Sequence, residues 1–201
     1  MQDNGIIFYR RFLNGDEGGL EDLIALYQRG LLRFIYGYVH DVALAEDILT
    51  DVFLTLYYKR SFKDRDGTGL KTYLYKIARN KALNAIRKRN RRKEISLDAL
   101  AEQGTNGEAE TEAQAFLYGE ALSPDKALER GERAKALYAA LNKLHADYRQ
   151  ALILRYYDNA EPETIAKIMK KNTKQVYNLL ARAKAALKEE LQSEGIDYEN
   201  I

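Results

Sequence analysis

The side chains best suited to chemistry in this sequence are cations and amides, and they are concentrated in one stretch. Residues 59–93 contain fourteen Lys or Arg and only two acids, a net charge of +12 in a chain whose overall charge is +2. Near the end of this stretch, Asn80, Asn84, Arg87 and Arg91 fall in one sector, roughly 60° wide, of a helix. Amides and guanidiniums on one stripe can hydrogen-bond base edges and phosphates together. The stretch predicts a nucleic-acid-binding helix, and a merely basic surface helix is the simpler alternative.

A second group of polar and basic residues lies near the C-terminus. Pro162 suits the first position of a helix over residues 162–169, and Asn172 suits the N-cap of a longer helix over residues 173–191. A short helix, a three-residue turn and a longer helix form a helix-turn-helix, whose second helix reads DNA with its N-terminal residues. The residues predicted to point outward there are Lys174, Gln175, Asn178 and Arg182. Two surface helices of an ordinary bundle are the simpler alternative.

Groups for catalysis or metal binding are missing from the sequence. It has no cysteine, and its two histidines, His40 and His145, are far apart. No carboxylate cluster has metal-ligand spacing, and no Gly-rich phosphate loop opens a helix. The Asp-Arg-Asp-Gly segment at residues 64–67 is superficially like a calcium loop, but Tyr75 stands where the bidentate Glu would be needed. We therefore expect no enzymatic activity, no metal and no cofactor.

The elements that position these residues are predicted to be helices. Only two prolines occur, and Ala, Leu, Glu, Lys and Arg dominate long segments. Residues 8–13 are interpreted as a turn. Apolar residues at helical spacing then predict a helix from Asp16 to Val39, with Gly30 as a candidate kink, and a second from an N-cap at Asp41 to residue 56. The same spacing predicts helices over residues 70–89, 128–144 and 148–156, the last two before the helix-turn-helix.

Charge and composition divide the chain into three parts. The predicted N-terminal domain covers residues 1–93, an acidic flexible linker covers 94–124, and the C-terminal domain covers 125–201. The fold class is therefore all-α, with two small helical domains joined by a flexible linker and a helix-turn-helix in the second. The absence of a signal sequence and of an apolar run of about 18 residues predicts a cytoplasmic protein without membrane insertion.

Two blocks of sequence, in this order, resemble the extracytoplasmic-function (ECF) group of bacterial RNA polymerase sigma factors in the sigma-70 family. AEDILTDVFL at 45–54, followed by LKTYLYKIARN at 70–80, is similar to the family's second conserved domain. YRQALILRYY at 148–157, TIA at 164–166 and residues 176–184 are similar to its fourth. The resemblance implies a two-domain subunit that binds core RNA polymerase and directs promoter-specific initiation by DNA binding and strand opening.

The resemblance also assigns roles to residues. The docking helix would contact core polymerase through Glu46, Asp47, Thr50, Asp51 and Phe53. The promoter −10 element would be bound and melted by Lys63, Arg65, Tyr73, Lys76, Asn80, Asn84, Arg87 and Arg91, with Tyr75 as a further candidate for base stacking. The −35 element would be read by Lys170, Lys171, Thr173, Lys174, Gln175, Tyr177, Asn178, Arg182 and Lys184.

The partners implied are core RNA polymerase, promoter DNA and an anti-sigma factor. The alternative is a conventional helix-turn-helix regulator whose N-terminal domain binds an effector or a partner. That alternative leaves unexplained the acidic helix followed by the +12 stretch. Because about thirty linker residues separate the two DNA-reading surfaces, we expect many relative placements of the domains and weak binding of duplex promoter DNA by the free protein.

Overall fold

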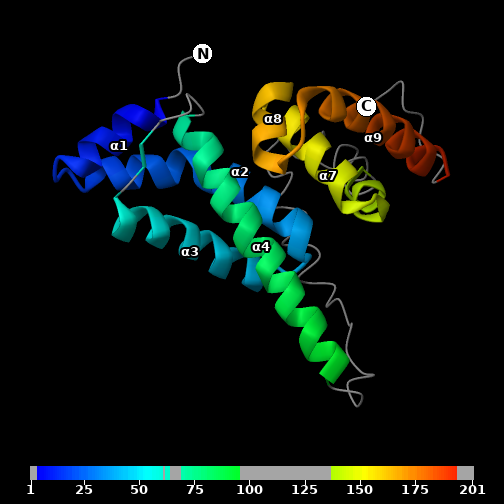
Figure 1. Ribbon diagram of the computed structural model, residues 1–201, viewed down its shortest axis with the longest axis horizontal. Coiled ribbons are helices and arrows are strands. Elements are labelled where there is room, and N and C mark those ends of the chain that lie inside the picture. The colour runs from blue at the N-terminus through cyan, green and yellow to red at the C-terminus, as the bar shows by residue number, and fades with distance from the viewer. Residues whose placement is uncertain (1–3, 61, 64–68, 96–136, 194–201) are drawn as a thin grey trace, which may run out of the picture.

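The structure is a computed structural model that describes residues 4–60, 62–63, 69–95 and 137–193 (Figure 1). Within these ranges every regular element is a helix, so the all-α prediction is confirmed. The N-terminal half contains α1 (Gly5–Leu13), α2 (Gly18–Val39), α3 (Val42–Lys59) and α4 (Gly69–Ile95). The C-terminal half contains helical residues 137–143, α7 (Ala146–Leu152), its π-helical continuation η1 (Ile153–Tyr157), α8 (Pro162–Met169) and α9 (Thr173–Ser193).

Helix α1 corrects the prediction of a turn over residues 8–13. It buries Tyr9 and Phe12, which are 1% and 2% exposed, against the rest of the N-terminal half. Its backbone also comes close to α2, because a Cβ added at Gly19 would lie 2.6 Å from both Phe8 O and Phe12 N. Nine residues hold too few apolar positions to establish a helical period, and the helix is stabilised by its packing against α2 and α4.

Helices α2 and α3 follow the prediction. Helix α2 runs unbroken through Gly30 and ends at Val39, and the next residue, His40, takes left-handed backbone angles (φ 53°). The Asp41 side chain then caps α3 by accepting a hydrogen bond from Leu44 N at 2.9 Å. The buried residues of α3 are Ala45, Ile48, Val52, Phe53 and Leu56. The acidic positions of this helix are thereby left on its outer side.

Helix α4 packs across α2 and α3 with its first half and projects from the body of the molecule with its second (Figure 1). Leu70, Leu74, Ala78 and Ala82 are completely buried. The helix continues to Ile95, two residues into the predicted linker, and the remainder of that linker lies outside the described residues. The strongly basic end of α4 thus extends away from the core, where burial of its charges would be costly.

The two halves of the chain are in contact with each other. Helix α7 packs on α2, and α8 packs on α4. The main hydrophobic cluster joins the N-terminal half to Leu154, Ile165, Ile168 and other residues of the C-terminal half, while a smaller cluster around Leu141, Leu152 and Leu187 belongs to the C-terminal half alone. Free movement of the halves was expected from the sequence, whereas the structure holds them together.

Candidate nucleic-acid and polymerase interfaces

The predicted stripe on α4 is an exposed face. Asn80, Asn84, Arg87 and Arg91 are all exposed, and Arg87 Nη1 donates a hydrogen bond to Asn84 Oδ1 at 3.2 Å. Lys76, one turn earlier, is half-buried. At 1.5 Å per residue the stripe from Asn80 to Arg91 is about 17 Å long. This face can present amides and guanidiniums to several nucleotides in succession, although its contact with DNA stays a prediction.

Another cation of α4 has a structural partner. Arg89 Nη1 donates to Val39 O at 3.1 Å, and Val39 is the last residue of α2. A guanidinium there offsets the partial negative charge at a helix C-terminus. With Arg149 it also acts on the neighbouring imidazole: burial, together with the positive charges of Arg149 and Arg89, lowers the pKa of His40 to about 4. Arg89 therefore fixes the exposed stripe relative to α2.

The aromatic residues of α4 correct the prediction of a stacking group. Tyr75 is 1% exposed, with its ring centroid 5.1 Å from that of Phe34, so it cannot receive a base in this conformation. Tyr73 is half-buried beside Phe62, with the ring centroids 5.1 Å apart. Lys63 is exposed, and Arg65 lies outside the described residues. Tyr73 is the remaining aromatic candidate for the −10 contact.

The N-terminus of α9 has the exposure required for reading DNA. Lys174, Gln175, Asn178 and Arg182 are exposed, whereas Val176, Leu180, Ala183 and Leu187 are buried. The predicted inward and outward faces of this helix are confirmed. Tyr177 is 57% exposed on the same outer side, and Thr173 is half-buried at the first position.

A reciprocal pair of hydrogen bonds fixes the start of α9. Gln175 N donates to Asn172 Oδ1, and Asn172 N donates to Gln175 Oε1, both at 2.8 Å. This is a capping box, which satisfies two backbone donors at once. The predicted N-cap is confirmed, and Gln175 gains a structural role that the sequence analysis did not assign. Its side-chain oxygen is engaged with the protein's own backbone.

The basic residues around the turn differ in their surroundings. Lys170 is exposed and takes left-handed angles (φ 57°) at the end of α8. Lys171 forms an ion pair with Asp147 at 2.9 Å, which ties the turn to the start of α7. Lys184 Nζ lies 5.3 Å from the ring centroid of Tyr156, a residue that is 52% exposed. Tyr156 thus lies beside a predicted phosphate contact, and its side-chain direction depends on the π-helical turn η1, which no sequence signal indicated.

The predicted docking face on α3 is largely exposed, with one correction. Glu46, Asp47, Thr50 and Asp51 are exposed, and Asp51 forms an ion pair with Lys81 of α4 at 3.2 Å. Phe53 is only 8% exposed and belongs to the core, so it is not available to a partner in this conformation.

Two exposed apolar residues extend this face. Leu54 is 44% exposed and Tyr58 76%, and at 100° per residue they share a sector roughly 60° wide with Asp47 and Asp51. The outer face of α3 is therefore acidic in its first half and apolar in its second. The helical spacing that identified the acids could have identified Leu54 and Tyr58 as well.

Among the described residues, no group of three or more His, Cys, Asp or Glu could hold a metal ion. The part of the chain described by the structure also contains no helix long and apolar enough to cross a membrane.

Comparison with known proteins agrees with this arrangement. Residues 23–92 match the family model described as Sigma-70 region 2, and residues 134–187 match Sigma-70, region 4. RNA polymerase sigma-H factor of Pseudomonas aeruginosa is 30% identical over 95% of this chain and 94% of its own length. ECF RNA polymerase sigma factor SigW of Bacillus subtilis is 25% identical over 89% of this chain and 91% of its own.

Solved structures give the same result. The sigma factor RpoE from Bartonella quintana, in complex with the anti-sigma factor NepR, has a TM-score of 0.62 at 25% identity, over 86% of this chain and 96% of that one. CnrH, in complex with the cytosolic domain of CnrY, has the same TM-score at 16% identity, over 95% and 99%, and supports the fold alone. The two conserved regions occur in the order expected from the sequence, and the chain belongs to the ECF group of the sigma-70 family, as a promoter-directing sigma factor.

Proposed function

We propose that this sigma factor docks on core polymerase through α3, melts the −10 element on α4 and reads the −35 element with α9. The observation that carries the proposal is the adjacency of two different exposed faces in the N-terminal half. The acidic and apolar face of α3 lies next to the amide and guanidinium stripe of α4, and the Asp51–Lys81 ion pair joins the two helices. A docking surface beside a DNA surface suits a subunit that delivers DNA to an enzyme.

The stripe on α4 suits an opened strand. Asn80 and Asn84 offer donors and acceptors to bases, while Arg87 and Arg91 offer charge to phosphates. Tyr73 supplies an aromatic surface at the base of the same helix, on which an unstacked base could rest. Helix α9 supports the complementary role, since its exposed N-terminal side chains have the position from which a recognition helix reads the major groove.

In this proposal the protein catalyses nothing itself and acts in the cytoplasm together with polymerase. An anti-sigma factor is a further proposed partner. This proposal is supported by the structural relative RpoE, which is in a complex with the anti-sigma factor NepR. A conventional regulator with an effector-binding N-terminal half is the second candidate, and it would bind promoter DNA without polymerase.

The test is reconstituted transcription with purified core polymerase and the double charge reversal Asp47→Lys/Asp51→Lys. Both residues are exposed, so the fold should persist while affinity for core falls by roughly tenfold or more, because like charges across an interface are costly. The control is Glu21→Lys, which reverses the charge of an exposed acid on α2 instead of α3, and this variant should bind core normally. Unchanged core affinity in the double variant would reject α3 as the docking helix. Tight, specific promoter binding without core would favour the conventional regulator.

A further inference from the structure

Tyr156, on η1, is an exposed aromatic residue that lies beside a cation of α9. It is 52% exposed, and its ring centroid lies 5.3 Å from Lys184 Nζ. An ammonium within about 6 Å of an aromatic ring centroid is attracted to the face of the ring. Tyr156 is not among the described residues that form the two hydrophobic clusters. The ring thus contributes to a surface next to the helix-turn-helix rather than to the core.

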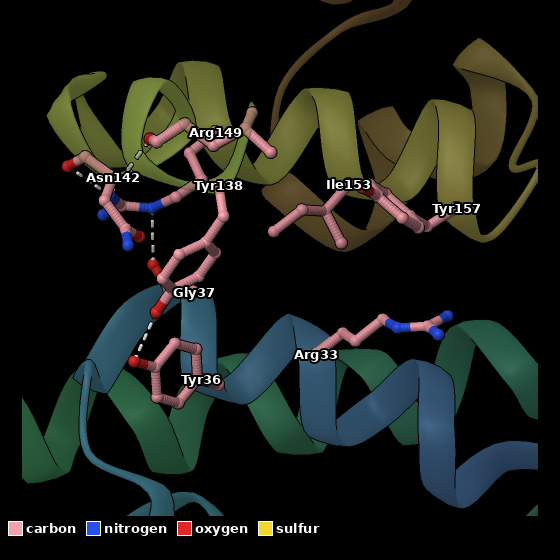
Figure 2. Close-up of a pocket in the computed structure, with 9 residues that line it drawn as sticks. Arg33, Tyr36, Gly37, Tyr138, Asn142, Arg149, Ile153 and Tyr157 are labelled. Atoms are coloured by element: carbon pink, nitrogen blue, oxygen red, sulfur yellow. Dashed lines mark hydrogen bonds between the residues drawn. The ribbon is translucent and has the colours of Figure 1, made fainter. Parts of the chain in front are cut away.

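The π-helical turn η1 sets the direction of the Tyr156 side chain. In a continuous α-helix, Tyr156 would point within about 40° of Leu152, which is 4% exposed. The i→i+5 register of η1 changes that direction, and π turns within helices are frequent at functional sites. Ile153 and Tyr157, the first and last residues of η1, turn toward α2 (Figure 2). Tyr156 is therefore left on another side of the turn, next to Lys184.

The backbone around Tyr156 is fixed by bonds within the C-terminal half itself. Leu154 is completely buried, and its carbonyl oxygen accepts a hydrogen bond from Ala160 N at 2.8 Å. Arg155 Nη1 donates to Ala160 O and to Glu161 Oε2, both at 3.2 Å. These bonds hold η1 to the loop that precedes α8, so the ring of Tyr156 has a fixed place beside the helix-turn-helix.

Lys184 lies on one flank of the DNA-reading face of α9. At about 100° per residue, a line midway between Lys174 and Asn178 marks the centre of that face. Arg182 lies about 60° to one side of this line, and Lys184 about 100° to the other. A recognition helix in the major groove has a row of phosphates on either side, so cations on opposite flanks can each meet one row. Lys184 is thus placed for the row opposite to that of Arg182.

An aromatic ring restrains a lysine in a different way from a carboxylate. The Lys171 ammonium is paired with Asp147 at 2.9 Å, and a phosphate would have to compete with that carboxylate. The ring of Tyr156 attracts the Lys184 ammonium through its π face and does not compete with phosphate as an anion would. A lysine stem has large rotamer entropy, and restraining it before binding lowers the cost of ordering it on a phosphate.

We propose that Tyr156 is a positioning residue for promoter binding, whose ring holds the Lys184 ammonium where a phosphate of the −35 duplex lies. The inference rests on the proposed function, in which α9 reads the −35 element. Tyr156 acts through Lys184 and touches no base, so it raises the affinity for all sequences alike. A leucine in its place would leave Lys184 present but unrestrained.

The experiment is a double-mutant cycle on the affinity of the holoenzyme for a promoter duplex that the holoenzyme itself has selected from random DNA. Lys184→Ala should weaken binding severalfold and lower the salt slope by about one, because one phosphate contact is lost. Tyr156→Leu, which keeps apolar bulk without the aromatic face, should weaken binding about two- to fivefold. Tyr156→Phe, which keeps the ring, should bind as the unsubstituted protein does. In the Lys184→Ala background, Tyr156→Leu should cause no further loss.

Sequence dependence separates this role from base reading. The factor lost in Tyr156→Leu should be the same for the selected duplex and for duplexes with single base-pair changes in the −35 element. The temperature of thermal unfolding should be unchanged, because the residue is exposed. Lys188→Ala is the matched control, since Lys188 is exposed on the same flank of α9, one turn further along. Its effect should add to that of Tyr156→Leu.

Two kinds of failure can be told apart. Unchanged affinity in Tyr156→Leu, an equal loss with and without Lys184, or Tyr156→Phe as weak as Tyr156→Leu would overturn the positioning role and leave reading by α9 intact. Unchanged affinity and sequence preference in both Lys174→Ala and Asn178→Ala would instead reject the proposed reading of the −35 element by α9, and the inference with it.

Discussion

The interior of the N-terminal half and the contact between the halves are built from different side chains. Where α1, α2 and α3 meet, the buried residues are Tyr9, Phe12, Leu23, Val52 and Leu56, all of them large and apolar or aromatic. At the contact between the halves, Arg149, Gln150 and Asp158 are buried beside apolar residues. Burial of the apolar groups in the first region is favourable, whereas burial of the polar groups in the second is costly unless they are hydrogen-bonded.

This difference separates two ways of joining helices in one chain. The exposed face of α3 and the stripe of α4 are joined by the apolar interior and by Arg89 at the end of α2. The contact of α2 and α4 with the C-terminal half adds buried polar side chains to apolar packing.

The largest expected effect comes from a cavity in the apolar interior. Leu23 is 0% exposed in α2, at the end of that helix remote from Gly37. Leu23→Ala should lower the free energy of unfolding by about 2–5 kcal/mol, because it removes buried methyl groups and leaves a void. Thermal unfolding followed by circular dichroism measures this directly. A loss below about 1 kcal/mol would show that the N-terminal interior is loosely packed and would weaken the contrast.

Most of the fold could be predicted from the sequence because the helices are long and their apolar residues keep a clear period. The starts of α3 at Asp41 and of α8 at Pro162 were predictable from a few residues, since N-caps and prolines at the first helical position act within one turn. The exposed faces of α3, α4 and α9 followed from the same periodicity. These features depend on neighbours within a few residues.

The errors arise where packing between elements decides. Tyr75 was predicted to be a candidate for stacking, but it is buried against Phe34 and Asp158. Helix α1 depends on close packing against α2, and η1 on a shifted hydrogen-bond register that ends with Asp158 N donating to Ile153 O at 3.2 Å. The contact between the halves produces no hydrophobic period within either segment, so the sequence of a single helix does not reveal it.

A smaller effect is expected from removing an unpaired amide at the contact between the halves. Gln150→Leu replaces a buried, unsatisfied side chain by an apolar one of similar size, which should be neutral or stabilising for docking. The temperature of thermal unfolding should therefore be unchanged or slightly higher than that of the unsubstituted protein. Ala181→Leu on the exposed side of α9 controls for added apolar surface. A lower unfolding temperature in Gln150→Leu would mean that the amide stabilises the contact.

The smallest effect is a pH dependence with two opposing contributions. Burial raises the pKa of Asp158, while Lys71, Tyr75 and Arg33 face it and oppose that rise. The folded protein thus holds a proton on Asp158 more tightly than the unfolded chain, and acidification through this group favours folding. His40 has the opposite sign: burial, Arg149 across the contact and Arg89 lower its pKa to about 4, so acidification from the ordinary pKa of about 6.5 favours unfolding.

Single substitutions separate these two contributions. In Asp158→Asn, stability should fall more steeply than in the unsubstituted protein as the pH falls from about 6.5 toward 4, because the opposing contribution of Asp158 is absent. In His40→Asn, which suits the left-handed backbone at that position, the fall should be shallower, because the contribution of His40 is absent. Thermal unfolding at a series of pH values measures both slopes. The same slope in both variants would mean that burial at the contact between the halves does not set the titration of these two groups.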